Sequence, residues 1–281
     1  LKGPVLAKMA YGDLALRQFY DLDILVRPQD MSPVNEALLS AGYSPLDTFT
    51  PKQERLHLKR AYELSFVHPK FTELDIHWRF PDFLGGGLHA DTAFGRKVQV
   101  NLEGKPVYAL APEDMLLFLC LHGGFEAWPT LSMVSDVARF LQCQETWDWS
   151  GLMHRAESLG MRRRLLLGLS LAEELLAAPV PSSITARINA DPVLLGPYQQ
   201  IQEKLLAGSS SATRFGAKNL FQIKIRERLK DKLAFVWVRS AVSQKADWWW
   251  LPLPDYLYWL YPIIRPLRLM SQYLIRVGGR K

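Results

Sequence analysis

The chain of 281 residues lacks several features that define large classes of proteins. Its two cysteines, Cys120 and Cys143, lie in segments with helical periodicity and suit neither a disulfide framework nor a zinc-ligand pair. We expect them to be small buried residues of a protein in a reducing compartment. No apolar run reaches the ~18 residues of a membrane span, and no signal peptide is visible. These absences favour a cytoplasmic protein without a transmembrane segment.

Several catalytic motifs are also missing. The sequence contains no P-loop, no dinucleotide-binding Gly-x-Gly-x-x-Gly and no nucleophile elbow. Its six histidines lack the spacing of zinc ligands. Three consecutive glycines at 85–87 do not stand at a strand-to-helix junction, so we predict a flexible connecting loop there. The chemistry therefore has to come from other residues.

Composition predicts a folded and basic protein. Hydrophobic residues make up 48% and charged residues 22% of the chain, as in ordinary globular proteins, and the length suits two domains. Much of the net charge of +6 lies at 162–164, 224–232 and 265–281, and basic clusters attract nucleic acid or an anionic membrane surface. Aromatic residues at 248–261 are interpreted as packing onto the helices, with a membrane interface as the alternative.

Two carboxylates in one strand are the most informative feature. Asp21 and Asp23 lie in the strand-like run 17–26, where alternation puts both side chains on one face. The other face, directed toward a core, carries Leu22, Ile24 and Val26. Adjacent like charges repel each other unless a cation lies between them, and carboxylate oxygens suit Mg2+ or Mn2+. A solvated turn at a strand edge is the alternative.

The residues before this strand predict a phosphate site. Gly3 followed by Pro4 is typical of a loop that opens a short helix, whose free N–H groups and positive dipole end attract phosphate. Arg17 stands at the entry to the strand, and its planar guanidinium suits phosphate oxygens. An ion pair of Arg17 with Asp13 or Asp21 is an equally favoured interpretation.

A third carboxylate follows in a later strand. The runs 62–67 and 71–80 alternate in hydropathy and are predicted to pair around a turn at 68–70. Asp75 then lies on the polar face of its strand and reaches the same site. Two metal ions held by three Asp residues position an attacking hydroxyl, neutralise a triphosphate and stabilise departing pyrophosphate. Asp75 is also placed to accept the proton of the hydroxyl.

Seven short segments form a recognisable pattern: residues 1–3, 16–17, 21–28, 41–43, 74–78, 112–117 and 121–122. Together they resemble the uncharacterised bacterial nucleotidyltransferases of the DNA polymerase beta superfamily. The resemblance runs from residue 1 to about 141 and returns in the tail at 253–254 and 265–268. It implies that Asp21 and Asp23 form the metal pair and that Asp75 takes the third carboxylate position.

The resemblance also assigns the turn before the strand. Gly3 belongs to the phosphate-binding turn. The superfamily usually has Gly-Gly or Gly-Ser there, whereas this chain has Lys2-Gly3-Pro4, so Lys2 is expected to hold part of the donor phosphates. His122 and Asp136 are expected to line the cleft, although a hydrogen-bonded core residue and an ion-pair partner are their more common roles.

The implied activity is transfer of a nucleoside monophosphate from an NTP such as ATP to a hydroxyl of an unknown acceptor, with release of pyrophosphate and with Mg2+ or Mn2+ as cofactor. Two alternatives stay open. RNA is a possible acceptor, because the chain is basic. A non-catalytic domain of the same fold that binds nucleotide or a partner is the other alternative, and the presence of all three Asp residues disfavours it.

The predicted fold class is α+β. Residues 1–110 form a small mixed-sheet nucleotidyltransferase domain, and 111–281 form an α-helical domain with an aromatic, Pro-rich, basic tail. The chain starts with Leu rather than Met, directly at the phosphate turn, so we expect preceding residues in the full protein. A hairpin is predicted at 98–110, and prolines are expected to interrupt any long helix after 251. The predicted helices are 31–41, 112–122 (ended by Gly123-Gly124), 131–142, 149–159 and 162–177.

Overall fold

A small mixed sheet holds the predicted strands. The computed structural model describes residues 1–81, 87–207 and 215–278, with side chains for all of these except 215–217 and 272–278. Residues 85 and 86 of the predicted glycine loop lie outside the described part. The sheet has the strand order β1-β4-β3-β2, in which β1 and β4 are parallel and the other neighbours are antiparallel. Its strands are β1 (Asp21–Leu25), β2 (Ser44–Pro45), β3 (Glu63–Val67) and β4 (Glu73–His77).

One face of this sheet forms a compact apolar core. Phe66, Leu74, Ile76 and Trp78 are buried there against α2 (Met31–Ser40). The cluster is completed by partly buried residues that include Leu22 and Val26 of the β1 segment and Leu58 of α3 (Pro51–Arg60). The prediction that Ile24 points into a core is wrong, because 41% of this residue is exposed. The strand β1 lies at one edge of the sheet, and Ile24 is not among the residues of this apolar cluster.

A separate hairpin lies beside the sheet. The strands β5 (Val98–Leu102) and β6 (Lys105–Ala109) pair as predicted around Glu103 and Gly104, both of which have positive φ. The helix α4 (Ala90–Arg96) precedes the hairpin. At the start of the chain, α1 (Pro4–Leu6) continues into a π-helical turn, Ala7–Tyr11, which packs against α6 (Leu131–Cys143).

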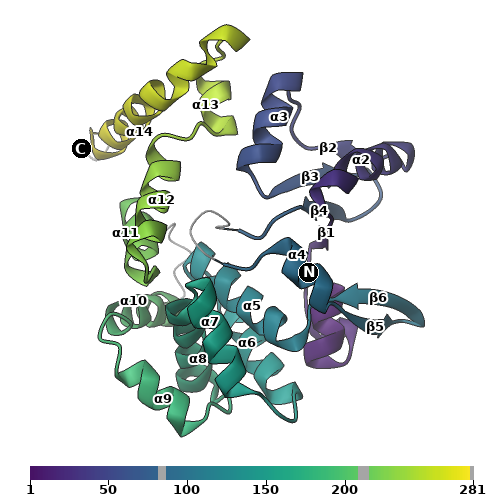
Figure 1. Cartoon of the computed structure of the whole chain (residues 1–281), viewed down its shortest axis with the longest axis vertical. Helices are drawn as coiled ribbons and strands as arrows, with labels where there is room; N and C mark the ends of the chain where they lie inside the picture. Colours follow the sequence, from purple (N-terminus) through teal and green to yellow (C-terminus); the bar gives the residue numbers. More distant parts are fainter. Residues whose placement is uncertain (82–86, 208–214, 279–281) are drawn as a thin grey trace.

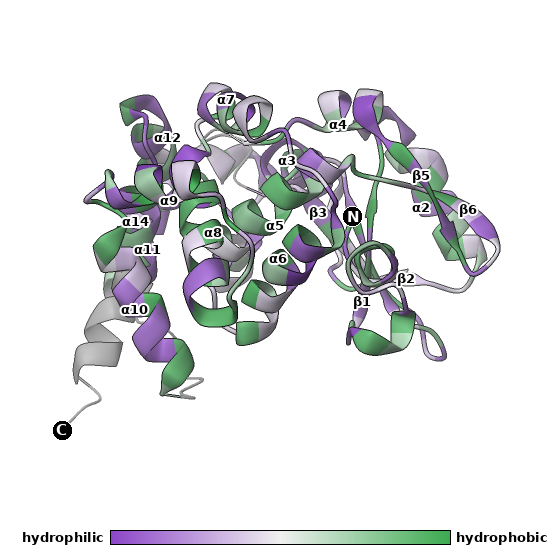
Figure 2. Cartoon of the chain, turned by 90° about the horizontal axis from the view of Figure 1, so that it is seen from below, coloured by the Kyte–Doolittle hydropathy of each residue, from purple (hydrophilic) through white to green (hydrophobic). Residues whose placement is uncertain are grey.

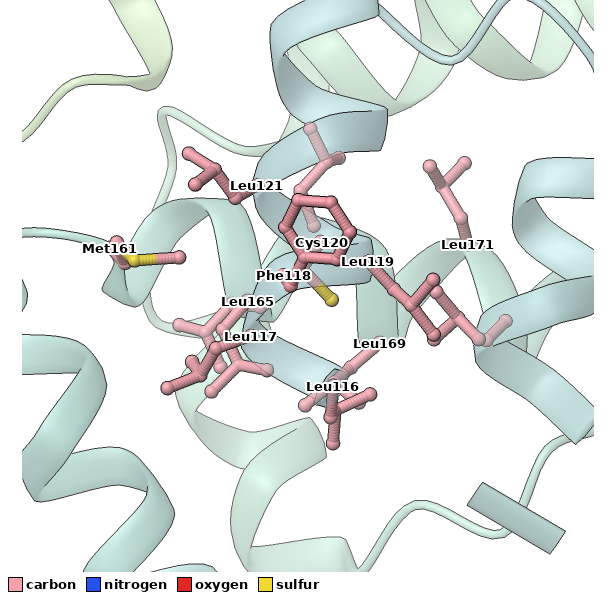
Figure 3. Packing of buried hydrophobic residues seen from close by; sticks show 14 of the residues in the cluster. Leu116, Leu117, Phe118, Leu119, Cys120, Leu121, Met161, Leu165, Leu169 and Leu171 are labelled. Atoms are coloured by element: carbon pink, nitrogen blue, oxygen red, sulfur yellow. The ribbon is translucent and has the colours of Figure 1, made fainter. Parts of the chain in front are cut away.

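Four helices form the main core of the second half (Figure 1). Besides α6, they are α5 (Pro112–Glu126), α7 (Trp149–Leu159) and α8 (Arg162–Leu176). The helix α5 is apolar on all sides and is buried along most of its length, as expected for a central helix. Figure 3 shows its leucines and Phe118 beside Leu165, Leu169 and Leu171 of α8. Cys120 is buried here as predicted, but Cys143 is exposed at the end of α6.

The helix α5 does not end at the glycine pair. It continues to Glu126 and stops at Ala127, which has φ +61°. Gly123 is required for packing instead, because a Cβ atom there would lie 2.6 Å from the buried ring of Trp128. The predicted stop at Gly123-Gly124 is therefore wrong, and the extra helical residues extend toward the sheet.

The last third of the chain contains helices and connecting segments, and no strand among its described residues. The prediction that prolines interrupt long helices there is wrong for α14, which contains Pro266. None of the helices in the described ranges is long and apolar enough to cross a membrane. Figures 1 and 2 show these last helices and the β5–β6 hairpin at opposite sides of the molecule. The elements are α9 (Ser182–Asn189), α10 (Leu195–Leu206), α11 (Phe215–Ile225), α12 (Leu229–Ser240), α13 (Lys245–Trp250) and α14 (Tyr261–Gly278).

Candidate active site

The parallel pairing of β1 and β4 brings two of the predicted carboxylates together. In this register Asp23 is the direct partner of Asp75, and paired residues of neighbouring strands project from the same face. His77 lies two residues beyond Asp75 on that face. Each of these three side chains offers one ligand atom, and the three atoms lie within 4.8 Å of one another. Asp21 lies outside this group, although it shares the same face.

His77 connects two carboxylates. Its Nε2 lies 2.9 Å from Oδ1 of Asp23, and its Nδ1 lies 3.5 Å from Oε2 of Glu63 on β3. Asp23 and His77 are both buried. The second oxygen of Asp23, Oδ2, receives no hydrogen bond from the described residues. The imidazole therefore fixes the orientation of the Asp23 carboxyl group and leaves one oxygen for a cation.

Asp75 is held from the other side of its strand. Ser65 of β3 is its register partner and donates a hydrogen bond of 2.5 Å from Oγ to Oδ1 of Asp75. This hydrogen bond fixes Oδ1 of Asp75, and it therefore also fixes the orientation of the whole carboxyl group, including Oδ2. The sheet thus holds both aspartates from neighbouring strands, with Oδ1 of Asp23 held by His77 and Oδ1 of Asp75 held by Ser65.

Lys2 supplies the positive charge of the site. Its Nζ lies 3.3 Å from Oδ2 of Asp23 and 3.9 Å from Oδ2 of Asp21. The repulsion that the sequence predicts between Asp21 and Asp23 is relieved by this ammonium group. Burial by itself would raise the pKa of Asp23, but the hydrogen bond from His77 and the charge of Lys2 outweigh burial and lower that pKa to about 2. Asp23 is therefore ionised at neutral pH.

A cavity of about 160 Å3 opens in front of these residues. Its sheet side carries Asp23, Asp75 and His77, and Lys2 also lines it. The opposite wall comes from α5, which contributes Phe118, His122, Phe125 and Glu126. The last two of these are available because α5 continues past the glycine pair. The cavity is small and acidic, and it suits metal ions and a small polar group rather than a whole nucleotide.

Two further titratable groups line this cavity. Burial, together with the charge of Lys2, lowers the pKa of His122 to about 4, so the imidazole is neutral at pH 7. Burial raises the pKa of Glu63, with Asp75 adding to the rise and His77 opposing it. The prediction that His122 lines the cleft agrees with this position, whereas Asp136 does not line the cavity.

The turn at Gly3 lies directly beside β1. Gly3 has φ +64°, and a Cβ atom there would lie 3.3 Å from the backbone oxygen of Asp21. Only glycine takes this conformation at low cost. The turn places Lys2 against the aspartates and starts α1 with Pro4 at its first position.

Arg17 has a different partner from those predicted. Its Nε lies 2.8 Å from Oδ1 of Asp136, and its Nη2 lies 2.9 Å from Oδ2 of the same residue. Tyr11 donates a third hydrogen bond to this carboxyl group, at 3.0 Å. The predicted ion pair of Arg17 with Asp13 or Asp21 is not formed. Arg17 instead joins the segment before β1 to α6, and its Nη1 lies 3.5 Å from the carbonyl oxygen of Gly3.

The donor atoms at the site fit a divalent cation. Asp23 and Asp75 offer hard carboxylate oxygens, the donors preferred by Mg2+ and Mn2+. The free Oδ2 of Asp23 is a buried anionic oxygen whose only close positive partner among the described side chains is Lys2. His77 was not predicted as a site residue, and Lys2 was predicted to bind donor phosphates rather than to contact the aspartates. The alternation of β4 places His77 on the face of Asp75, but contact with Asp23 depends on a pairing 54 residues apart.

A comparison with known proteins gives a family match over this part of the chain. A family model described as an uncharacterised nucleotidyltransferase matches residues 1–177. No curated protein and no solved structure matches the chain. The matched residues contain the sheet, the hairpin and helices up to α8, whereas α9 to α14 lie outside them. The match extends past residue 141, where the predicted resemblance ends, and does not include the tail at 253–268.

Proposed function

The chain belongs to this nucleotidyltransferase family, and we propose that it transfers a nucleoside monophosphate from an NTP to a hydroxyl group of an acceptor, with release of pyrophosphate. The observation that carries the proposal is the convergence of Asp23 and Asp75 on adjacent parallel strands, beside Lys2, in a cavity closed by α5. These residues all lie within the matched part of the chain. Family membership supports nucleotidyl transfer as the general activity.

Each site residue has a proposed role. Asp21, Asp23 and Asp75 would hold a divalent cation, Mg2+ or Mn2+, which when bound neutralises the triphosphate and lowers the charge at the departing oxygens. His77 keeps Oδ1 of Asp23 occupied, so that Oδ2 faces the cation. Lys2 and the Gly3 turn would bind donor phosphates. Arg17 is proposed to act on the same turn through its contact near the Gly3 carbonyl.

The bonds formed and broken, and the proton released, can all be assigned to atoms of the substrates and of these residues. The acceptor hydroxyl oxygen forms a bond to the α-phosphorus of the NTP, and the bond from that phosphorus to the pyrophosphate oxygen breaks. The hydroxyl proton passes to the carboxylate of Asp75, which Ser65 holds in place. The neutral imidazole of His122 lies on the opposite wall of the cavity and is available to hydrogen-bond the acceptor.

One observation favours the non-catalytic alternative. Lys2 compensates the charge of Asp23, and His77 is hydrogen-bonded to it, so Asp23 already has partners without a metal ion. A domain that binds nucleotide without turnover would have the same fold. RNA as the acceptor remains a prediction, and Lys2 is the only Lys or Arg among the described residues that line the cavity.

The proposal is tested by label transfer from α-labelled NTPs to a pool of cellular metabolites and RNA in the presence of Mg2+ or Mn2+. Asp75→Asn is expected to reduce transfer at least ~100-fold, because it removes both a metal ligand and the proton acceptor. The matched control is Asp91→Asn, an exposed residue of α4, which should retain activity. Circular dichroism checks that both variants fold. Full activity of Asp75→Asn would reject the assigned mechanism.

A second variant addresses the metal directly. Asp23→Asn is expected to abolish binding of Mn2+, measured by electron paramagnetic resonance without nucleotide. It should also lower the free energy of unfolding at pH 7 by on the order of 2 kcal/mol, because the lowered pKa of Asp23 shows that the fold stabilises its charged form. Mn2+ binding by the wild type without any transfer activity would favour the non-catalytic alternative.

A further inference from the structure

In the last helices of the chain, charged side chains are buried and apolar side chains are exposed, which is the reverse of the usual distribution. A surface helix normally directs apolar residues to the core and charges to water. In α14, Arg265 and Arg268 are buried, and both bind the buried carboxylate of Asp247 on α13. The exposed positions between 261 and 271 are instead all apolar, namely Pro262, Ile263, Pro266, Leu267 and Met270. The charged side of this amphipathic helix therefore faces inward.

The neighbouring helix α12 shows the same feature. It packs against α14 and exposes four apolar residues spaced along one helical face, of which Leu229 and Trp237 are the most exposed, at 71% and 65%. The four are Leu229, Leu233, Val236 and Trp237. Lys230 is exposed on the same helix. Two adjacent helices thus present apolar side chains that the rest of the described chain does not cover.

Exposed aromatic residues accompany these helices. Trp249 and Trp250 follow the buried Trp248 on α13, and Tyr256 and Trp259 precede α14. More than half of each of these four residues is exposed. Trp and Tyr combine an apolar ring with a polar N–H or O–H group, which suits the boundary between lipid and water. We call the exposed apolar and aromatic residues of α12, α13, α14 and the segment 251–260 the C-terminal apolar surface.

Charge distinguishes between possible partners for this surface. Residues 178–281 contain 16 Lys and Arg against 6 Asp and Glu, a net charge of +10, whereas residues 1–177 contain 18 against 22, a net charge of −4. A second copy of the chain would bring a surface of the same sign against this one, which is unfavourable. An anionic surface is attracted. Nucleic acid binding needs cations on the surface itself, but Arg265 and Arg268 are buried against Asp247, and the exposed positions of α14 between 261 and 271 are apolar.

We propose that the C-terminal apolar surface binds the face of an anionic lipid membrane, with α14 lying in the plane of the interface. The apolar residues of α12 and α14 enter the boundary between headgroups and acyl chains, and the excess of Lys and Arg in 178–281 provides long-range attraction. None of these residues lines the site cavity, so this binding is separate from the proposed transfer reaction.

The test is co-sedimentation of the full chain with vesicles. Vesicles of phosphatidylcholine with phosphatidylserine are expected to bind the protein, and phosphatidylcholine alone should bind it more weakly. Raising the salt concentration should weaken binding without abolishing it, because apolar insertion is not screened. Sedimentation with the anionic vesicles that equals the lipid-free control would overturn the proposal.

A pair of double variants separates apolar insertion from net charge. Ile263→Glu with Leu267→Glu is expected to reduce binding about tenfold or more, since it removes two inserted side chains. Leu39→Glu with Leu195→Glu changes the net charge equally at exposed leucines outside the surface, and its smaller loss measures the charge effect alone. Equal losses in the two double variants would reject insertion.

Two other outcomes would assign the surface to another partner. Light scattering that shows a dimer in the wild type and a monomer in Ile263→Glu with Leu267→Glu, without vesicle binding, would identify a second copy as the partner. RNA binding that both double variants retain, again without vesicle binding, would identify nucleic acid. Asp75→Asn should bind vesicles as the wild type does, which keeps this test independent of the transfer reaction.

Discussion

Residues 1–177 and 178–281 differ in which charges they bury and in which side chains they expose. In the first region, the buried carboxylate of Asp23 faces a cavity, lies beside the ammonium group of Lys2 and is hydrogen-bonded to His77. In the second region, the buried Arg265 and Arg268 share one aspartate, and apolar residues of the same helix face outward. The first arrangement leaves the buried Oδ2 of Asp23 without a hydrogen bond from the described residues, with the Lys2 ammonium group 3.3 Å away. The second arrangement places two arginines on one carboxylate, and these ion pairs hold a helix whose apolar side stays exposed.

The largest loss of stability is expected from breaking the ion pairs of Arg265 and Arg268 with Asp247. Asp247→Ala leaves Arg265 and Arg268 buried without their carboxylate and removes the hydrogen bond from the Gln244 N–H group. We expect the free energy of unfolding to fall by about 3–5 kcal/mol, measured by urea denaturation. Asp255→Ala, at an exposed residue of the same region, is the control and should change it by less than about 1 kcal/mol.

A triple variant sharpens this interpretation. Replacing Asp247, Arg265 and Arg268 together with leucine removes the unpaired charges, and it should recover part of the lost stability. If the triple variant is as unstable as Asp247→Ala, then packing rather than charge pairing holds α14 in place.

The second prediction concerns the pH dependence of stability that arises from His122 in the first region. The pKa of His122 is lowered from 6.5 to about 4 by burial and by Lys2, so between these values the unfolded chain binds a proton that the folded chain does not. Stability should therefore fall as the pH drops from 6.5 to 4, by on the order of 2 kcal/mol from this residue. Chemical denaturation of the wild type and His122→Asn at several pH values measures the difference.

His57 contributes to the same pH window, since burial also lowers its pKa. The difference between wild type and His122→Asn isolates one residue from the other. His89→Asn, at an exposed position, serves as the control and should leave the pH profile unchanged. An identical profile for His122→Asn would mean that the α5 wall does not exclude water from this imidazole.

Local periodicity predicted much of the first region. The alternation around Asp21 and Asp75 predicts two strands with carboxylates on their polar faces, and these strands pair with Asp23 opposite Asp75. The hairpin at 98–110 and the helix at Trp149–Leu159 also follow from local patterns. These features depend on neighbouring residues, so a single sequence contains enough information for them.

Features that depend on distant residues were not predicted. Arg17 binds Asp136, which is 119 positions away, and no local pattern indicates that pairing. The glycine pair at 123–124 has the pattern of a helix end, but the close approach of Trp128 explains Gly123 instead. Arg265 and Arg268 suggest an exposed basic tail until Asp247 is seen between them. In each case a tertiary contact overrides the local interpretation.

The smallest expected effect tests whether a divalent cation can replace Lys2 as the positive partner of Asp23. Lys2 lies 3.3 Å from Oδ2 of Asp23, where it competes with a divalent cation for that oxygen. Unit charges 4 Å apart interact by ~1 kcal/mol in water and ~4 kcal/mol near a protein surface. Lys2→Met should therefore raise the affinity for Mn2+ alone about tenfold, which corresponds to ~1.4 kcal/mol, and should lower the affinity for NTP because a phosphate ligand is lost. Lys8→Met is the charge-matched control, since the ammonium group of Lys8 donates to the Gly12 carbonyl and Lys8 does not line the cavity. If Lys2→Met leaves the Mn2+ affinity unchanged, Lys2 is a fixed partner of Asp23, and the site then resembles the closed arginine–aspartate cluster of the C-terminal helices.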